Sequence, residues 1–493
     1  MTESSATALP GTVPAPPTRL EPDAIGVAQD TVIGMATSAP AAVVGITLLS
    51  LAVAANYSGG LLLLISVVPM LIIANAYRRL NMWNANCGAS FEWVGRSINP
   101  YLGWLTGWLM IAGYVLGTLS GVEVLGPSVL TIFGASPTNH WHNVEIATAV
   151  GLVMTMIAVV GIRITARTQV VMAAVEYTIL VGMSIWGLIY VLNHHAGTFP
   201  ITRDWFSLNG IAGTHSNGLN PSSNVVAGFL IAIFAYSGWD GTVYVNEEVR
   251  HRRTNPGRAA LIAVALLAVI YTLAQVGLQG VVSPAKLQAN SASPLVYVAG
   301  ALGGSGWEKV MALALALSVI ATVGAGIVVG ARIIYGMASY RALPEFLANV
   351  PRRFATPAAA SVVFGLVVVA AAWVYLLATS VQNAFSYVVN LTGILFALFY
   401  ILTALASMTY YRRRVLSNVW DALVLGLLPL AAAGFLGWMV VQGVATSPIP
   451  QRWSLAAIVG AGLILMVMSR VFLRSQFFHI QRESDPGLAA VAS

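Results

Sequence analysis

Charged residues are scarce in this sequence. They make up 8% of its 493 residues, whereas a soluble globular domain carries about 25%. Hydrophobic residues make up 58%, so the chain has too few charges to cover the surface of a soluble globule. The composition excludes an ordinary soluble fold and predicts a polytopic membrane protein.

Cysteine is almost absent as well. Cys87 is the only one, which excludes an intramolecular disulfide and any metal cluster held by cysteines. The sequence also contains no Walker loop, no HExxH motif and no GxSxG motif. We therefore expect a protein that is not an enzyme, uses no cofactor and has no metal site. The lack of a nucleotide-binding domain argues against a primary pump.

Long apolar runs are what the sequence has instead. Runs of about 20 residues, each long enough to cross a bilayer as a helix, recur along the whole chain. We expect an all-α polytopic membrane protein with about twelve transmembrane helices. The expected spans are residues 31–55, 60–79, 101–133, 145–164, 169–193, 224–246, 259–282, 307–338, 357–379, 384–411, 420–443 and 453–473.

The basic residues predict the orientation, because Lys and Arg accumulate in cytoplasmic loops. With the N-terminus inside, all but four of the 24 basic residues fall on the cytoplasmic side, the exceptions being Arg203, Lys286, Lys309 and Arg452. We therefore expect cytoplasmic N- and C-termini. The basic residues are spread loop by loop, so the net charge of +7 does not indicate a nucleic-acid partner.

Two of the expected spans contain helix breakers. Pro40 interrupts span one, and Gly238 interrupts span six, about 200 residues later. Interrupted helices at corresponding positions of two halves point to a transporter built on inverted repeats. We expect five spans plus five, with two more added at the end.

This organisation gives the expected domains. A disordered cytoplasmic tail covers residues 1–24, the transporter domain covers 25–475, and a second cytoplasmic tail covers 476–493. Within the transporter domain, repeat one spans about 31–193, repeat two about 224–411, and the extra helices 420–473.

Asp240 is the most informative single residue. It lies in the middle of an apolar span, where a carboxylate costs roughly 2.5–3.5 kcal/mol of insertion free energy. It also follows the break at Gly238, and irregular backbone is tolerated at this depth where it lines a cavity. We expect a broken helix around a polar substrate site.

Three segments resemble the amino acid-polyamine-organocation (APC) superfamily of permeases. They are NCGASFEWVGRSINPYLGWLTGW from Asn86, FAYSGWDGTVYVNEEVRHRRTNPGRA from Phe234 and ARIIYGMASYRALPEFLANVPRRFATP from Ala331. The resemblance covers roughly residues 25–475 and implies a LeuT-type fold that moves amino acids or related amines by alternating access. One departure is that the family's frequent Gly-Ser-Gly break in span one is replaced by Ala36 to Pro40, which loses the glycines.

The broken helices predict how a substrate binds. Half-helices offer free N–H groups to an anion and free carbonyls to a cation, so a zwitterion fits both. The resemblance to the APC superfamily places Phe234 at an aromatic gate position. The same resemblance implies the substrate-binding residues of span three. Core packing is an open alternative for Phe234 and Tyr114. The expected substrate-binding residues are Thr37, Ser38 and Ala39 in span one, Gly113, Tyr114 and Thr118 in span three, and Phe234, Ala235, Ser237 and Asp240 in span six.

Glu176 is the expected ion-coupling residue. It stands in span five, where some proton-coupled members of the similar family carry a lysine. An acid here can hold a proton or coordinate a cation, with Ser318 and Thr322, one helical turn apart in span eight, adding oxygens. A neutral Glu176 that is hydrogen-bonded within the bundle is the alternative.

Two further acids lie at the inner end of span six. Glu247 and Glu248 stand close in sequence to Arg250 and Arg252, and we expect gate or loop ion pairs among them.

The predicted function is secondary active transport of amino acids or related amines across the plasma membrane, coupled to protons. The expected partners are a small-molecule substrate, protons and the lipid bilayer. An exchanger or a sodium-coupled permease is the alternative within the same class. An amine-binding channel or sensor is the alternative from another class.

Overall fold

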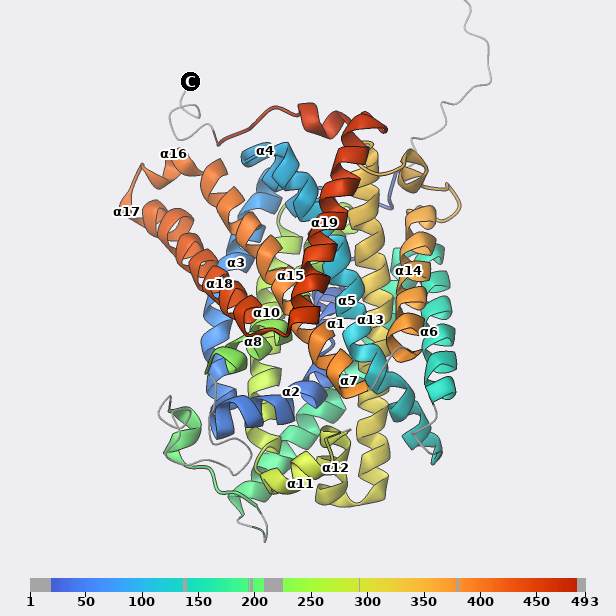
Figure 1. Ribbon diagram of the computed structural model, residues 1–493, viewed down its shortest axis with the longest axis vertical. Coiled ribbons are helices and arrows are strands. Elements are labelled where there is room, and N and C mark those ends of the chain that lie inside the picture. The colour runs from blue at the N-terminus through green and yellow to red at the C-terminus, as the bar shows by residue number, and fades with distance from the viewer. Residues whose placement is uncertain are drawn as a thin grey trace, which may run out of the picture.

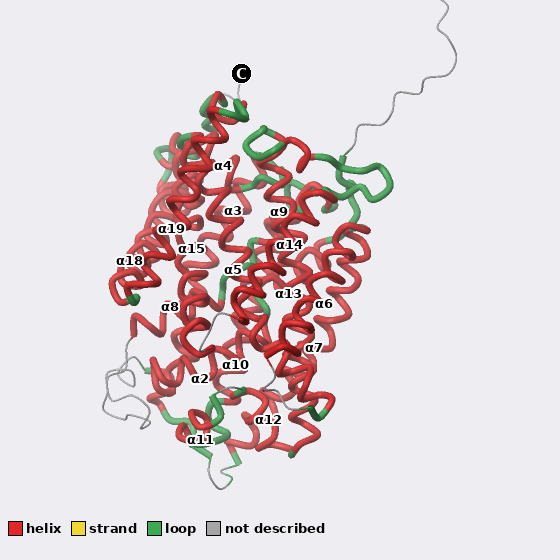
Figure 2. The backbone as a smooth tube through the Cα atoms, turned by 45° about the vertical axis from the view of Figure 1, so that its right-hand side comes forward, coloured by secondary structure: helices red, strands yellow, loops and turns green. Residues whose placement is uncertain are grey.

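The computed structural model describes residues 19–135, 140–193, 195, 198–207, 225–291, 293–377 and 381–485. The regular elements within these ranges are helices, packed into one elongated bundle (Figures 1 and 2). Residues 1–18 and 486–493, which belong to the two expected tails, lie outside the described part of the chain.

The expected spans are all present. Ten helical runs in the described residues are long and apolar enough to cross a membrane. One of these runs, Val27–Trp83, contains spans one and two, and two short helices, α8 (Val225–Ala235) and α9 (Gly241–Tyr244), form span six. The predicted all-α class with twelve spans is therefore confirmed.

The helices match the expected spans to within a few residues. Span one consists of α1 (Val27–Thr37) and α2 (Pro40–Ala55), and span two is α3 (Gly59–Trp83). The other spans are α5 (Pro100–Phe133), α6 (His140–Val160), α7 (Ile162–Leu192), α10 (Asn255–Leu278), α13 (Ser305–Ser339), α14 (Ala358–Leu377), α15 (Val381–Tyr410), α18 (Leu428–Thr446) with the turns before it, and α19 (Ile449–Val471).

The packing of the helices follows the two repeats. The most extensive helix contacts join α5 to α13, α3 to α10 and α6 to α14. Each contact pairs a helix of the first half with the helix that holds the same place in the second half. A two-fold axis between repeats brings equivalent helices together in this way. The arrangement is that of a LeuT-type fold with five plus five helices and two more.

The two interrupted spans have the predicted breaks. Between α1 and α2, Ala39 adopts a left-handed conformation with φ 46° and ψ 61°, and Pro40 then begins α2. Between α8 and α9, Gly238 has a φ of 103°. A side chain at Gly238 would also clash with Thr37, since a Cβ there would lie 2.6 Å from the Thr37 carbonyl oxygen. The second break therefore requires glycine, while the first tolerates a strained alanine.

The two ends of the bundle differ in charge. The end that carries α4 (Ser90–Ser97), α16 (Arg412–Val415) and the described C-terminal residues holds Arg96 and three consecutive arginines (Figure 1). We call it the basic end. The opposite end carries α11 (Pro284–Ala289) and α12 (Pro294–Gly303) (Figures 1 and 2).

The chain after α19 folds back across the basic end. The Phe477 ring is fully buried and stacks on Phe91, with 3.8 Å between the ring centroids. The Glu483 N–H donates to the Arg96 carbonyl at 2.7 Å. We call residues 475–485 the C-terminal strap, because they join α4 to the ends of α13 and α15.

Candidate functional site

A cavity lies where the two broken helices meet. It holds about 20 Å³ of free space, room for about one water molecule. Ten residues line it: Thr37, Ser38, Ala39, Val43, Gly117, Ser120, Phe234, Ser237, Thr392 and Phe396. They come from both sides of the break in span one, from α5, from α8 and the residues after it, and from α15.

The two breaks are bonded to each other. The Thr37 hydroxyl lies 2.5 Å from the Gly238 carbonyl oxygen, and it also lies 2.8 Å from the Gly34 carbonyl oxygen. Thr37 therefore joins the end of α1 to the irregular backbone of span six. Residues about 200 positions apart form one polar junction beside the cavity.

The N-terminus of α2 does not offer free donors to a substrate. The Ala41 N–H donates to Glu176 Oε1 at 2.9 Å, and the Ala42 N–H donates to the Ser318 hydroxyl at 3.2 Å. The Val43 N–H donates to the Ala39 carbonyl at 2.8 Å, and Pro40 has no N–H. The first four positions of α2 are therefore satisfied within the protein. This differs from the expectation that both half-helices leave free N–H groups for a substrate.

The carbonyls of span one are also held by side chains. The Thr322 hydroxyl donates to the Ala36 carbonyl at 2.8 Å, and the Tyr271 hydroxyl donates to the Ser38 carbonyl at 3.0 Å. Together with Glu176 and Ser318, these residues surround the break from α7, α10 and α13. The structure thus brings the three expected ion-coupling residues, Glu176, Ser318 and Thr322, to one place.

Asp240 lies outside the cavity lining and is fully buried. Its Oδ1 accepts from the Tyr400 hydroxyl at 2.7 Å, and its Oδ2 accepts from the Tyr244 hydroxyl at 2.8 Å. The Tyr400 oxygen in turn accepts from the Gly238 N–H at 3.3 Å. Two phenol donors offset the cost of burying this carboxylate. Asp240 is therefore linked to the break in span six through Tyr400 rather than placed against the cavity.

Half of the expected substrate-binding residues line the cavity, namely Thr37, Ser38, Ala39, Phe234 and Ser237. The others are not among the lining residues, namely Gly113, Tyr114, Thr118, Ala235 and Asp240. Thr118 packs directly on Gly326 of α13 and donates to the Tyr114 carbonyl. Gly113 faces Phe396, and the Tyr114 ring lies 5.3 Å from the ring of Phe396. Both residues therefore pack against Phe396, which itself lines the cavity.

Five further residues that line the cavity were missed by sequence reasoning. They are Val43, Gly117, Ser120, Thr392 and Phe396. Gly117 and Ser120 follow Gly113 by four and seven residues, so a helical repeat from Gly113 would have found them. Thr392 and Phe396 are four residues apart on α15, and nothing in the sequence indicates which face of that helix turns inward.

Another buried carboxylate was also missed. Asp30 of α1 is fully buried, and neither of its oxygens has a hydrogen-bond partner among the described residues. Asp30 lies one residue before the expected start of span one at residue 31, so it was not counted within the membrane.

A buried ion pair joins the end of span six to α13. Both oxygens of Glu248 accept from Arg332 of α13, at 2.8 and 2.9 Å, and both side chains are fully buried. Glu248 was expected to form a gate or loop ion pair with Arg250 or Arg252, and this choice of partner was wrong. The turn after α9 directs Glu248 into the bundle, where an arginine 84 residues away lies within reach. A bidentate pair of this kind is a strong, oriented contact.

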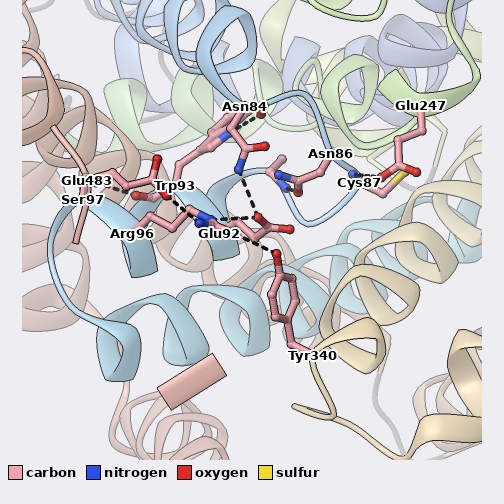
Figure 3. Close-up of polar contacts among 11 residues, drawn as sticks. Asn84, Asn86, Cys87, Glu92, Trp93, Arg96, Ser97, Glu247, Tyr340 and Glu483 are labelled. Carbon is pink, nitrogen blue, oxygen red and sulfur yellow. Dashed lines mark hydrogen bonds and ion pairs between the residues drawn. The ribbon is translucent and has the colours of Figure 1, made fainter. Parts of the chain in front are cut away.

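Glu247 has a backbone partner instead. Its Oε1 accepts from the Cys87 N–H at 3.0 Å (Figure 3). The neighbouring Asn246 amide donates to the Asn86 carbonyl at 2.9 Å. The loop between α3 and α4 is thus fastened to the inner end of span six beside the Glu248 pair.

Arg96 is the centre of a second polar group at this end. Its guanidinium lies 3.2 Å from Glu92, 3.0 Å from the Tyr340 hydroxyl and 2.6 Å from Glu483 (Figure 3). Burial raises the pKa of the Glu92 carboxyl, and Arg96, Asn84 and Tyr340 oppose that rise. Arg96 therefore ties α4, the end of α13 and the C-terminal strap together.

Comparison with known proteins agrees with this architecture. The sequence profile described as "Amino acid permease" matches residues 29–472. A vacuolar cationic amino acid transporter 4 from Arabidopsis thaliana is 22% identical over 324 residues, which cover 63% of this chain and 51% of that protein. Asc-type amino acid transporter 1 from Mus musculus is 31% identical over 140 residues, which cover 28% of this chain and 26% of that protein. The chain thus matches about half of the first relative's length and about a quarter of the second's.

Solved structures agree on the fold. A manganese transporter from Eremococcus coleocola, in complex with an aromatic bis-isothiourea compound, superimposes with a TM-score of 0.56 at 11% identity, covering 92% of this chain and 95% of that one. A point variant of the same transporter gives a TM-score of 0.59 at 13% identity. At this identity the likeness concerns the LeuT-type fold alone. The family and the relatives are transporters rather than enzymes, and on the match over residues 29–472 this chain belongs to the amino acid permease family of the APC superfamily.

Proposed function

We propose that the chain is a secondary active transporter of amino acids or related amines. The observation that carries the proposal is the cavity at the junction of two broken helices, where Thr37 of one break is bonded to Gly238 of the other. Half-helix ends at mid-membrane are a recurrent substrate site of such transporters. Membership of the amino acid permease family supports the substrate class.

Alternating access is part of this proposal. The cavity of about 20 Å³ is too small for an amino acid. In this proposal the buried Glu248–Arg332 pair holds the basic end closed. A substrate can therefore enter and leave only if helices move, and the pair must separate when the basic end opens.

The proposed coupling ion is the proton, and Glu176 is its carrier. Glu176 accepts from the Ala41 N–H, so its charge state acts directly on the break in span one. A sodium ion is less suited to this position, because the Ala41 and Ala42 N–H groups both point toward the oxygens of Glu176 and Ser318. A donor hydrogen repels a cation. Asp240, bonded to Tyr400, is a second proposed proton-exchanging group.

Uptake into proteoliposomes tests the coupling. An inward proton gradient without sodium should drive accumulation of substrate, and Glu176→Gln should abolish that drive while leaving counterflow exchange. Glu145→Gln is the matched control, because the Glu145 side chain is 71% exposed and pairs with its neighbour His142. A requirement for sodium would favour the sodium-coupled alternative. Exchange without any effect of either gradient would favour an exchanger.

The same assay separates a transporter from the alternative of another class. A channel or a sensor that binds amines cannot accumulate substrate against its gradient. Uptake that never exceeds equilibration would therefore refute secondary active transport.

We further propose residence in the plasma membrane with both termini in the cytoplasm, and division of the chain into repeats near 31–193 and 224–411. The basic end would then face the cytoplasm, in line with the distribution of arginine. A cysteine replacing Arg253 should be shielded from impermeant reagents applied outside, while one replacing Ser216, which lies outside the described residues, should react. Labelling in the opposite sense would overturn the orientation.

Since the Arabidopsis relative is named as vacuolar, fractionation of cell membranes tests the compartment.

A further inference from the structure

The cavity has two chemically different walls. One wall is the junction of the two breaks, which carries backbone polar groups and the hydroxyls of Thr37, Ser38 and Ser237. Under the proposed function these residues hold the amino and carboxyl groups that every amino acid shares. The other five lining residues, Val43, Gly117, Ser120, Thr392 and Phe396, are here called the second wall, and they are left to contact the side chain of the substrate.

The second wall is uncharged, and its two hydroxyls bond within their own helices. The Ser120 hydroxyl donates to the Gly117 carbonyl at 2.7 Å, and the Thr392 hydroxyl donates to the Val388 carbonyl at 2.7 Å. A hydroxyl can turn between such a carbonyl and a ligand, and it has lone pairs that accept. The wall therefore offers a substrate neutral hydrogen bonds but no charge.

This chemistry disfavours a charged side chain of either sign. A carboxylate, an ammonium or a guanidinium group of a substrate side chain would be desolvated against this wall without an opposite charge. The buried acids nearest the breaks do not supply that charge, because neither Asp240 nor Glu176 lines the cavity and both are already hydrogen-bonded. An aliphatic side chain or an alcohol, which can donate to Ser120 or Thr392, meets no such cost.

The second wall also restricts size. Gly117 lies opposite Phe396 and Thr392, and a Cβ at Gly117 would lie 3.6 Å from the nearest atom of each. These are ordinary contact distances, so alanine fits at position 117 without displacing the protein. It would, however, occupy space that a substrate side chain could use. Gly117 and Phe396 therefore set how large that side chain can be.

We propose that the substrate is a zwitterionic amino acid with a small, uncharged side chain, aliphatic or hydroxyl-bearing, and that Gly117, Ser120, Thr392 and Phe396 select it. The inference rests on the proposed transport function and narrows its substrate class. It runs against the printed name of the Arabidopsis relative, a cationic amino acid transporter, so the two readings make opposite predictions.

Uptake of radiolabelled L-alanine, L-serine, L-phenylalanine, L-lysine and L-glutamate by the full chain in proteoliposomes tests the inference. Alanine and serine should be taken up at least tenfold faster than lysine and glutamate. Uptake of lysine at a rate equal to that of alanine would overturn the inference while leaving the transport function intact. If none of the five is accumulated, thermal stabilisation of the purified protein by each amino acid keeps the inference testable. Stabilisation by lysine but not by alanine would then refute it.

Two variants test the named residues. Ser120→Ala removes an acceptor and should raise the ratio of the KM for serine to the KM for alanine about fivefold, the loss expected for one neutral hydrogen bond. Gly117→Ala should lower serine uptake relative to alanine uptake, because it takes space from the larger side chain. Thr178→Ala is the matched control, since the exposed Thr178 hydroxyl also bonds within its own helix, to the Ala174 carbonyl at 2.7 Å. Equal substrate ratios in Ser120→Ala, Gly117→Ala and the control would remove these residues from selection.

Discussion

Removing one partner of the buried ion pair should open the basic end. In the described conformation Glu248 and Arg332 bond through two contacts of 2.8 and 2.9 Å with no exposure to solvent. Glu248→Gln would leave the Arg332 charge buried without a counter-charge. Such a change costs about 3–5 kcal/mol. In a conformation open at this end, water solvates Arg332 and that cost disappears.

The cost therefore falls on the closed conformation alone. Since each 1.4 kcal/mol corresponds to about tenfold in an equilibrium constant, the open population should rise by roughly 100-fold or more. A cysteine replacing Val249, which is buried beside the pair, reports the opening through its rate of labelling from the basic end. Replacing the single native Cys87, also buried, with serine removes background labelling.

Two controls make the assay specific. Glu345→Gln disrupts an exposed ion pair, in which the Glu345 side chain is 70% exposed and the Arg341 side chain 53%. This change should alter the labelling rate little. The double variant Glu248→Leu with Arg332→Met removes both charges and should accelerate labelling much less than the single variant, because no unpaired charge remains. If the single variant labels at the parental rate, or no faster than the double variant, the pair does not hold this end closed.

Further changes test other parts of the molecule. Asp240→Asn should give a folded protein with lower transport or a shifted pH dependence, and wild-type uptake with an unchanged pH profile would make Asp240 merely structural. Ala39→Gly should raise the free energy of unfolding in detergent by about 1 kcal/mol, because it removes the strain of a non-glycine residue in the left-handed region. A lower free energy of unfolding would contradict that account. Phe477→Ala should destabilise the protein by about 3–5 kcal/mol, the usual cost of emptying a buried phenylalanine site, as measured by thermal unfolding. Asp30→Leu should be neutral or stabilising in the same measurement, since it removes a buried acid that has no hydrogen-bond partner within the described part of the chain. A large loss of stability would reveal a contact of Asp30.

The spans were predictable because hydrophobic length alone defines them. Both breaks were predictable too, since Pro40 and Gly238 are residues that helices tolerate poorly. The left-handed conformation of Ala39 was not, because an alanine there is stable only through the contacts that surround it. Among these is the bond from the Tyr271 hydroxyl to the carbonyl of the preceding residue.

Contacts between distant helices were the harder part. Nearness in sequence assigned Glu248 to Arg250 or Arg252, while the fold assigns it to Arg332. The helix rotation that turns Thr392 and Phe396 toward the cavity is likewise a property of packing, and the hydrophobic pattern of α15 does not reveal it. The residues at the breaks were predictable because proline and glycine disrupt a helix at their own positions, whatever packs around them.

The bond between Thr37 and Gly238 also bears on how the protein is made. When the ribosome has delivered only the first repeat, the end of α1 has none of the partners that the second half supplies, including Tyr271, Ser318 and Gly238. Backbone groups left open in a bilayer are costly. During synthesis, the backbone groups at the break in span one therefore lack these partners until span eight has entered the membrane. A ribosome stalled between these spans should leave a nascent chain that quality-control proteases recognise.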